Sequence, residues 1–573
     1  MPLRIRTMTP RGCAPITPGK LTVLVGPNNS GKSQTLRDIR DYLVSGSLQH
    51  LTILEQIEVD LPNVDEAVSE VSIQSHQNPG NVRVHGVAND LQNRHELGIG
   101  ENWVTQMYSQ QPNHNAPGSA HSRGMLLRHM GTFWCGYLDA EGRFRLAAPT
   151  DSYDRRTESP GNALQKFFSG GKEAENKLRG AFRKAFGMDI ALDWAAMRKL
   201  YLKVGPGFGD IPDTLEGLNS LLQEAPELSQ QGDGYKSFSG IVLAMLSFPN
   251  RILLLDEPEA FLHPAQARTL GRWIAEQSAA RPSQTIIASH SAAFLWGLVS
   301  QAPDATVVRL RRQKRETVYT VVGSEITAGL IASPLLSSQP VLDALFHRGV
   351  IVCEGDPDRA IYQTVLHRFF NESRGDEVLL IHSNGKDAMR SPIEMLRQAG
   401  APVCAIVDLD VLNSSDILSG IVQALTGKEI SSCLLELRKA ISVAVEQATE
   451  EDLLQSMKAS AETWWRQQFS SLREARRSLV AIARQKSKWD NVKAQGINYF
   501  SGEVRAIAER LVGDLAKIGL FVVPCGELEG WIPIGIAKGR RWNAAALEKL
   551  HAGECPSDLR DFVGNAARYI LSE

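Results

Sequence analysis

The segment Gly26-Pro-Asn-Asn-Ser-Gly31-Lys32-Ser33 constrains the fold of this chain more than any other stretch of the sequence. It fits the pattern G-x-x-x-x-G-K-[ST], and it lies between an apolar run typical of a strand, 21–25, and a helical pattern that begins near Lys32. In such a loop the backbone N–H groups surround phosphates, the lysine reaches the β and γ phosphates, and the serine hydroxyl is a ligand for Mg²⁺. A chance match in a glycine-rich loop is the alternative, and the strand, loop and helix context argues against it. The sequence therefore predicts an α/β domain that binds ATP and Mg²⁺, with the binding residues Gly26, Asn29, Gly31, Lys32, Ser33 and Gln34.

A second motif supports the same chemistry independently. Arg251-Ile-Leu-Leu-Leu-Asp256-Glu257-Pro-Glu259 places carboxylates at the end of a buried strand, where unpaired acids are disfavoured unless they serve a cation or phosphate chemistry. Asp256 is the predicted Mg²⁺ ligand, and Glu257 is predicted to orient or deprotonate the attacking water. The next apolar run, 285–288, leads to His290, which can hydrogen-bond a γ-phosphate. A solvated strand end is the alternative for this group.

Acidic residues also follow three apolar runs in the second half of the chain. The runs are 349–353, 402–407 and 520–523, and the acids that follow them are Glu354, then Asp408 and Asp410, then Glu527 and Glu529. The carboxyl ends of neighbouring parallel strands meet at one crevice, so these acids can gather although they are far apart in sequence. Clustered carboxylates repel one another, and Mg²⁺ or Mn²⁺ relieves that repulsion most simply. Solvated strand ends with a purely structural role are the alternative.

These motifs resemble two known families. The first three resemble the Walker A, Walker B and H-loop motifs of ABC-type ATPases, and Glu257-Pro-Glu259-Ala-Phe-Leu-His263-Pro264 resembles the branch that includes the OLD (overcoming lysogenization defect) nucleases. Glu354 with the Asp408-x-Asp410 pair resembles a TOPRIM domain, in which a glutamate and a DxD pair bind the metal. The resemblance covers most of the chain but leaves the regions around 60–230 and 415–515 largely unmatched.

The resemblance implies working residues for both sites. In the ATPase half these are Lys32, Ser33, Asp256, Glu257 and His290, while Lys236-Ser-Phe-Ser239-Gly240 is the nearest match to the family's signature motif. Ser239 and Gly240 would then complete the nucleotide site of an opposite subunit, which implies a homodimer or a higher homo-oligomer. No Q-loop glutamine can be placed. In the TOPRIM-like half the implied metal ligands are Glu354, Asp358, Asp408, Asp410, Glu527 and Glu529, and Lys538 is the residue expected to steady a pentavalent phosphate, with Lys386 as an alternative.

The expected fold is α/β in both halves. Residues 1–335 are predicted to form an ABC-type P-loop ATPase domain with an insertion at about 60–230, closed by a β-hairpin at 306–322. Residues 345–573 are predicted to form a Rossmann-like TOPRIM domain with a helical insertion at about 415–515. The chain lacks an apolar run of the ~20 residues needed to span a bilayer and lacks a secretory signal, so we expect a cytoplasmic protein with no membrane partner.

Composition leaves the question of a nucleic-acid partner open, because a net charge of -2 does not exclude local basic surfaces. Two basic groups are candidates, although solvated faces are the more common explanation of such patterns. They are Arg309, Arg311, Arg312, Lys314 and Arg315 in the expected hairpin, and Arg473, Arg476, Arg477, Arg484, Lys486 and Lys488 in the expected helical insertion.

The sequence thus favours an ATP-regulated, Mg²⁺- or Mn²⁺-dependent nuclease, with DNA favoured over RNA as the substrate. The family likeness suggests anti-phage defence or DNA processing. One rival is an ATPase sensor or scaffold with a degenerate TOPRIM domain that works by binding a partner protein. Another is a repair ATPase of the SMC-like kind, which predicts a long heptad coiled coil between Lys32 and Ser239 that the polar, glycine-containing region does not supply.

Overall fold

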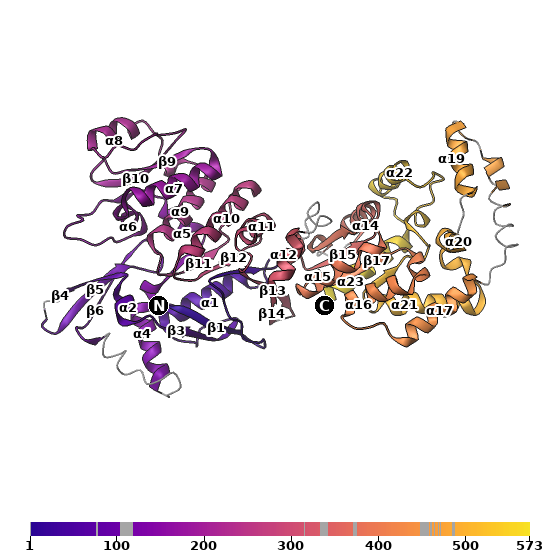
Figure 1. Ribbon diagram of the computed structural model, residues 1–573, viewed down its shortest axis with the longest axis horizontal. Coiled ribbons are helices and arrows are strands. Elements are labelled where there is room, and N and C mark those ends of the chain that lie inside the picture. Colours follow the sequence, from indigo (N-terminus) through magenta and orange to yellow (C-terminus); the bar gives the residue numbers. More distant parts are fainter. Residues whose placement is uncertain are drawn as a thin grey trace. The chain divides into compact units, whose positions relative to one another are not determined.

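The computed structural model divides the chain into two compact units, Met1–Ala332 and Ser333–Glu573 (Figure 1). The residues that it describes are 2–75, 78–103, 118–314, 316–332, 342–370, 375–446, 458, 461–462, 464–467, 469, 472–483 and 488–572. Among these residues, no helix combines the length and the apolar character needed to cross a membrane.

The first unit contains one large sheet and three smaller ones. Its strands are β1 (Arg4–Pro10), β2 (Leu21–Val25), β3 (Leu54–Asp60), β4 (Val71–Ser75), β5 (Asn81–Val87), β6 (Arg94–Gly100), β7 (Cys135–Leu138), β8 (Thr150–Asp151), β9 (Asp189–Asp193), β10 (Lys199–Gly205), β11 (Ile252–Asp256), β12 (Thr285–Ala288), β13 (Thr306–Gln313) and β14 (Glu316–Val322). Its helices are α1 (Lys32–Ser45), α2 (Val64–Val68), α4 (Gly118–Trp134), α5 (Ala140–Leu146), α6 (Ala163–Ser169), α7 (Gly171–Phe186), α8 (Leu215–Leu222), α9 (Asp233–Ser247), α10 (Pro264–Ala280), α11 (Ala292–Gln301) and α12 (Ser324–Ala332).

The large sheet has the strand order β14-β13-β2-β12-β11-β7 and is parallel except for the edge strand β14. Every residue of β2, β11 and β12 is buried, as expected for a parallel sheet covered on both faces. The strand ends that carry the P-loop, Asp256 and Ser289 therefore lie at the same edge of this sheet. The predicted hairpin at 306–322 is confirmed as β13 and β14.

The region 60–230 differs from the predicted insertion. It contributes β7 to the large sheet, beside β11, so it is not wholly an elaboration outside the core. It also forms the antiparallel sheets β4-β5-β6 and β8-β10-β9, which the sequence reading missed. Strand β7 was missed because it has only four residues and directly follows α4, so no alternation of apolar and polar residues marks it.

The second unit is built on a parallel sheet with the order β16-β15-β17-β18. Its strands are β15 (Gly349–Cys353), β16 (Val378–His382), β17 (Val403–Val407) and β18 (Leu520–Val522), and β15, β17 and β18 match the apolar runs at 349–353, 402–407 and 520–523. Its helices are α14 (Asp356–Phe369), α15 (Arg390–Gln398), α16 (Ser415–Thr426), α17 (Ser432–Glu446), α19 (Leu472–Ala483), α20 (Lys488–Gln495), α21 (Gly502–Ala516), α22 (Arg540–His551) and α23 (Ser557–Ser572). The 3-10 turns η5 (Leu409–Asn413) and η6 (Gly496–Tyr499) complete the elements that shape the site.

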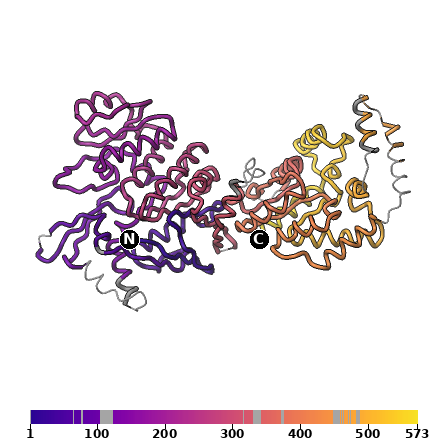
Figure 2. The backbone as a smooth tube through the Cα atoms, in the orientation of Figure 1, coloured from indigo at the N-terminus to yellow at the C-terminus, as the bar shows by residue number. Residues whose placement is uncertain are grey.

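The chain leaves this sheet after β17 and returns as β18 by way of the predicted helical insertion, a path that Figure 2 traces. Helix α21 packs against β18, so the last part of the predicted insertion is a crossover helix of the core. Of the basic residues named above, Arg309 is buried and cannot belong to a basic surface. Arg315, Arg484 and Lys486 lie outside the described residues, as do the side chains of Arg473 and Arg477.

Candidate functional site

The P-loop has the backbone of an anion-binding loop. Gly26, Asn29 and Gly31 have positive φ angles of 147°, 61° and 100°, a conformation that turns successive backbone N–H groups toward one concavity. The Lys32 ammonium donates to the carbonyls of Gly26 at 2.7 Å and Pro27 at 2.9 Å. It therefore lies over the P-loop, where a bound phosphate could also accept from it. Burial lowers the pKa of Lys32, with the nearby acids opposing the shift. These features fit the binding of a nucleoside triphosphate.

The predicted Mg²⁺ ligands of the ATP site are in contact. Ser33 Oγ donates to Asp256 Oδ1 at 2.8 Å, which joins the start of α1 to the end of β11. Burial raises the pKa of Asp256, and the hydrogen bond from Ser33 opposes that shift. A hydroxyl and a carboxylate in contact beside a phosphate-binding loop are the protein ligands that Mg²⁺ takes in a nucleotide site.

Glu257 and His290 also lie together. The carboxylate of Glu257 is 3.3 Å from His290 Nδ1, and its hydrogen bond with the histidine lowers the pKa of Glu257 and raises that of His290. The buried Glu259 accepts from Ser289 Oγ at 2.7 Å and from the His290 backbone N–H at 2.9 Å, so it fixes the loop that carries the histidine. The arrangement gives an ionised carboxylate beside an imidazole at the open edge of the sheet, as required to orient a water molecule.

The sequence reading missed two residues that hold this edge. The buried Arg143, from α5, donates to the backbone carbonyls of Asp256 at 2.6 Å and Glu257 at 3.0 Å, and to Ser237 Oγ at 2.8 Å. Glu257 has a positive φ of 50°, so the guanidinium braces a strained turn. Tyr137, at the end of β7, donates to Asp256 Oδ2 at 3.3 Å. Tyr137 lies in β7 and Arg143 in the helix that follows β7, so neither contact could be predicted without knowing where β7 lies. The sequence pattern does not reveal that position.

Three residues predicted to contact nucleotide are not supported by the geometry. Ser239 and Gly240 are buried inside α9, six residues or more beyond its start at Asp233, and this position does not support the predicted role in an opposite subunit's site. The cause is that the short Ser-Gly match carries no information about its depth in the helix. Gln34 is a residue of α1, and its side-chain amide donates to Asp38 of the same helix at 2.9 Å and to Thr52 at 3.3 Å rather than pointing into the P-loop.

In the second unit, the acids at the strand ends gather as expected. Ligand atoms of Glu354, Asp408 and Asp410 all lie within 4.8 Å of one another. Glu354 Oε1 accepts from the Asp408 backbone N–H at 2.9 Å, and the buried Asp410 Oδ1 has no hydrogen-bond partner among the described residues. A set of carboxylate oxygens with one left unsatisfied fits a hard cation such as Mg²⁺ or Mn²⁺.

The remaining predicted ligands flank this trio. Asp358 Oδ2 accepts from the Gly355 N–H at 2.9 Å at the start of α14, and the charge of Asp408 acts on it. Glu527 and Glu529 lie beside the predicted Lys538, whose Nζ is 2.7 Å from Glu527 Oε2 and 3.4 Å from Glu529 Oε2. Asp358, Glu527 and Glu529 thus lie near the trio but are not among the three residues whose ligand atoms lie within 4.8 Å of one another. We refer to the place where these six acids meet as the carboxylate crevice.

Burial and mutual repulsion shift the titration of these acids. Burial, reinforced by the charge of Asp408, raises the pKa of Glu354 to about 7 and that of Asp358 to about 6. Burial also raises the pKa of Asp408, which the Lys493 ammonium opposes. Strongly shifted carboxyl groups that converge on one crevice are a feature of functional sites.

Two further lysines neutralise the trio. Lys386, the alternative named from the sequence, lies 2.7 Å from Asp410 Oδ2. The second is Lys493 of α20, whose Nζ is 2.7 Å from Asp408 Oδ2 and 3.5 Å from Asp410 Oδ2. Lys493 was not predicted, because the helical pattern around it does not indicate a functional site.

We expect Mn²⁺ to raise the melting temperature of the protein more at about pH 8 than at about pH 5.5, because metal ligands must be ionised. The pKa of Glu354 is raised from its usual 4.5 to about 7, so the unfolded state ionises first and the stability due to this group falls as pH rises through that window. An ion that binds the carboxylates above pH 7 reverses that loss. Thermal melting with and without Mn²⁺ across this range measures the effect, and an equal increment at both pH values would contradict it.

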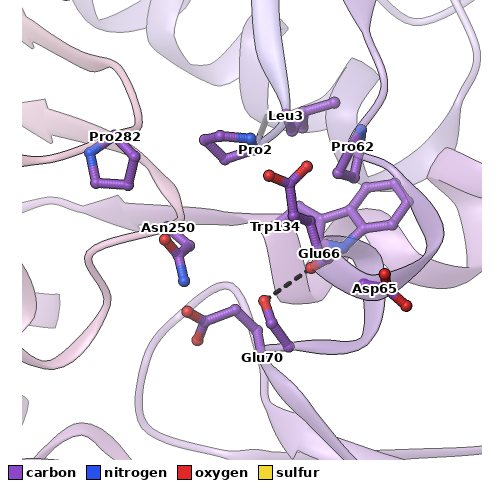
Figure 3. Close-up of a pocket in the computed structure, with 10 residues that line it drawn as sticks. Pro2, Leu3, Pro62, Asp65, Glu66, Glu70, Trp134, Asn250 and Pro282 are labelled. Carbon is purple, nitrogen blue, oxygen red and sulfur yellow. Dashed lines mark hydrogen bonds between the residues drawn. The ribbon is translucent and has the colours of Figure 1, made fainter.

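Figure 3 shows a separate pocket in the first unit, with a volume of about 270 Å³. Two of its acidic residues already have structural partners: Glu66 caps α2, and Glu70 pairs with Lys166. The P-loop, Asp256 and His290 do not line it, so it is distinct from the nucleotide site.

Two family models match the chain. Residues 150–295 match the model described as "AAA domain, putative AbiEii toxin, Type IV TA system", which includes Asp256, Glu257 and His290. Residues 345–410 match the TOPRIM domain of overcoming lysogenization defect protein-like sequences, which includes Glu354, Asp358, Asp408 and Asp410. No curated protein matches the chain.

Solved structures with some similarity include SMC head domains. An SMC head bound to the C-terminal winged-helix domain of ScpA is 13% identical, with 56% of this chain and 98% of that chain covered and a TM-score of 0.34. The SMC head domain from Thermotoga maritima is 12% identical, with 56% and 99% covered and a TM-score of 0.30. The two family matches occur in the order that the motifs predict, and the chain is accordingly a fusion of an ATPase domain with a TOPRIM domain of the overcoming lysogenization defect family.

Proposed function

We propose that this protein binds and hydrolyses ATP and cuts nucleic acid, with DNA favoured over RNA, in a reaction that depends on Mg²⁺ or Mn²⁺. The observation that carries the proposal is the gathering of Glu354, Asp408 and Asp410 at one crevice, with lysines at its rim. The TOPRIM match over the same residues supports it.

The carboxylates of Glu354, Asp408 and Asp410 would hold the metal ion, with Asp358, Glu527 and Glu529 available for a second ion. A bound ion polarises a phosphodiester and lowers the pKa of water. Lys538 would neutralise the negative charge that builds on the phosphate, and the position of its ammonium beside Glu527 supports this role.

In the ATPase unit, Lys32 would bind the β and γ phosphates, and Ser33 and Asp256 would hold Mg²⁺. Glu257 would orient the attacking water, with His290 beside it. We propose that nucleotide binding assembles a homodimer or a higher homo-oligomer and that ATP turnover controls cleavage.

The test is an incubation of the full-length protein with supercoiled DNA, linear DNA and single-stranded RNA, in Mg²⁺, Mn²⁺ or EDTA, with and without ATP. We expect metal-dependent cleavage of DNA that EDTA abolishes. ATP hydrolysis without cleavage of any substrate in any metal would instead support the scaffold function, in which a partner protein is the target.

A role in anti-phage defence is our proposal for the biological setting, and the family resemblance is its support. We expect phage plating to fall on cells that express the protein and to recover when Glu354 is replaced by alanine. Equal plating on both strains would argue against defence while leaving the enzymatic proposal intact.

A further inference from the structure

We propose that Lys493 binds the phosphodiester at the carboxylate crevice, so that the helical insertion supplies a substrate-binding residue of the active site. This inference rests on the proposed nuclease function and extends it to a part of the chain beyond the TOPRIM match, which ends at residue 410. Lys493 reaches Asp408 Oδ2 at 2.7 Å and Asp410 Oδ2 at 3.5 Å from helix α20.

The position of Lys493 is built into the fold. Gly526, in the loop after β18, has a φ of 99°, and a Cβ atom there would lie 1.9 Å from the Lys493 carbonyl oxygen. The chain beyond α20 is held to the same loop, because the Ile497 N–H donates to the Pro524 carbonyl at 2.8 Å. Trp489 and Val492 of the same helix are buried, so α20 is packed into the unit. Only a glycine at position 526 allows this approach, so the end of α20 is fitted closely to the edge that carries Glu527.

The same loop links Lys493 to the DxD pair. The Leu409 N–H donates to the Gly526 carbonyl at 2.9 Å, and α20 packs against η5, the turn that contains Asp410. Two backbone contacts therefore fix the position of Lys493 relative to the carboxylates. A lysine that served only as a solvent-exposed polar residue would not require a fixed position.

The charges of the crevice indicate what Lys493 would bind. The shortest contact of each of three lysines is with a different acid: Lys386 with Asp410, Lys493 with Asp408 and Lys538 with Glu527. Among the described residues, the six predicted ligands outnumber these three lysines, which leaves room for a cation to balance the acids. A metal ion held by Asp408 and Asp410 would compete with Lys493 for their carboxylates, and the Lys493 ammonium would then be available to a phosphodiester bound at the same site. The side chain is 24% exposed, so the ammonium is accessible to a ligand. Lysine binds phosphate as a point charge, without the two-pronged geometry of arginine.

The test compares full-length wild type with Lys493→Met, Lys493→Arg and the control Lys517→Met. Lys517 directly follows α21, its side chain is 76% exposed, and it pairs with the nearby Asp514. Binding to labelled duplex DNA is measured by fluorescence anisotropy across a salt series in Ca²⁺, and cleavage is measured in Mn²⁺. Thermal melting verifies that each variant is folded.

We expect Lys493→Met to reduce the slope of log affinity against log salt by about 0.9, the loss of one phosphate contact. Cleavage should fall by about 10²-fold, with Lys493→Arg restoring binding and Lys517→Met resembling wild type. A mutant with unchanged salt slope and tighter Mn²⁺ binding would overturn the proposal, because Lys493 would then act only as a counter-ion to the carboxylates.

Failure of the nuclease function itself gives a different result. A wild-type protein that binds DNA in Ca²⁺ but does not cleave it in Mn²⁺ overturns the nuclease proposal, while the salt slope still decides the role of Lys493. A wild-type protein that neither binds nor cleaves overturns both.

Discussion

Replacement of Asp408 by asparagine is expected to reduce nucleic-acid cleavage by about 10³-fold and to leave ATP hydrolysis unchanged. The amide keeps the size of the side chain but removes the charge that would bind the metal ion. The carboxylate of Asp408 belongs to the trio and also pairs with Lys493. The substitution therefore weakens the metal site and the contact with the lysine together, while the backbone N–H that donates to Glu354 is kept.

Asp376 provides the matched control in the same unit, because its side chain is 93% exposed. Asp376→Asn should cleave at the wild-type rate, while Asp408→Asn should also lose most of its affinity for Mn²⁺ in isothermal titration calorimetry. Cleavage by Asp408→Asn at the wild-type rate would show that the reaction occurs elsewhere, whatever its metal dependence.

The acids of the crevice could be found from sequence because parallel strands impose a simple rule. Residues that follow buried apolar runs lie at one edge of the sheet, so Glu354, Asp408 and Asp410 were expected to meet, and their ligand atoms do lie together. No such rule applies to Lys493. It lies on a helix, and its contact depends on how closely a glycine in a distant loop lets that helix approach. The positions of helices on a sheet follow from packing, which local patterns do not encode.

In the ATPase unit, too, residues at strand ends could be predicted, whereas residues positioned by packing could not. The P-loop, β11 and β12 were predicted because each combines a strand with a motif. Strand β7 is short and carries no motif, so its place beside β11 could not be predicted. Arg143 lies on α5, the helix that follows β7, and its contact with the turn at Glu257 could therefore not be predicted either. Ser239 illustrates a different difficulty, since a two-residue match does not show that the residue lies buried well inside α9.

Replacement of Glu257 by glutamine is expected to slow ATP hydrolysis by about 10²- to 10³-fold while ATP still binds. The residues that contact phosphate and Mg²⁺, namely Lys32, Ser33 and Asp256, are untouched, and the backbone carbonyl of Glu257 stays bonded to Arg143. Only the ionised carboxylate beside His290 is lost. Phosphate release measures hydrolysis, fluorescent-nucleotide titration measures binding, and the exposed Glu276 provides the control substitution Glu276→Gln. Loss of nucleotide binding in Glu257→Gln would contradict this assignment, because a water-orienting residue is not required for affinity.

The same variant separates the effect of bound ATP from the effect of its turnover. If nucleotide binding drives assembly, Glu257→Gln with ATP should have the mass of a dimer or larger in solution, whereas Lys32→Ala, which cannot hold the phosphates, should not respond to ATP. A Glu257→Gln protein that stays monomeric with ATP bound would count against assembly by nucleotide. Cleavage by the trapped variant then gives the sign of the control: faster cleavage than wild type means that bound ATP activates the TOPRIM unit, and slower cleavage means that it restrains the unit until hydrolysis. Either result requires coupling between two chemically separate sites, because no residue of the P-loop motif belongs to the unit that contains Asp408.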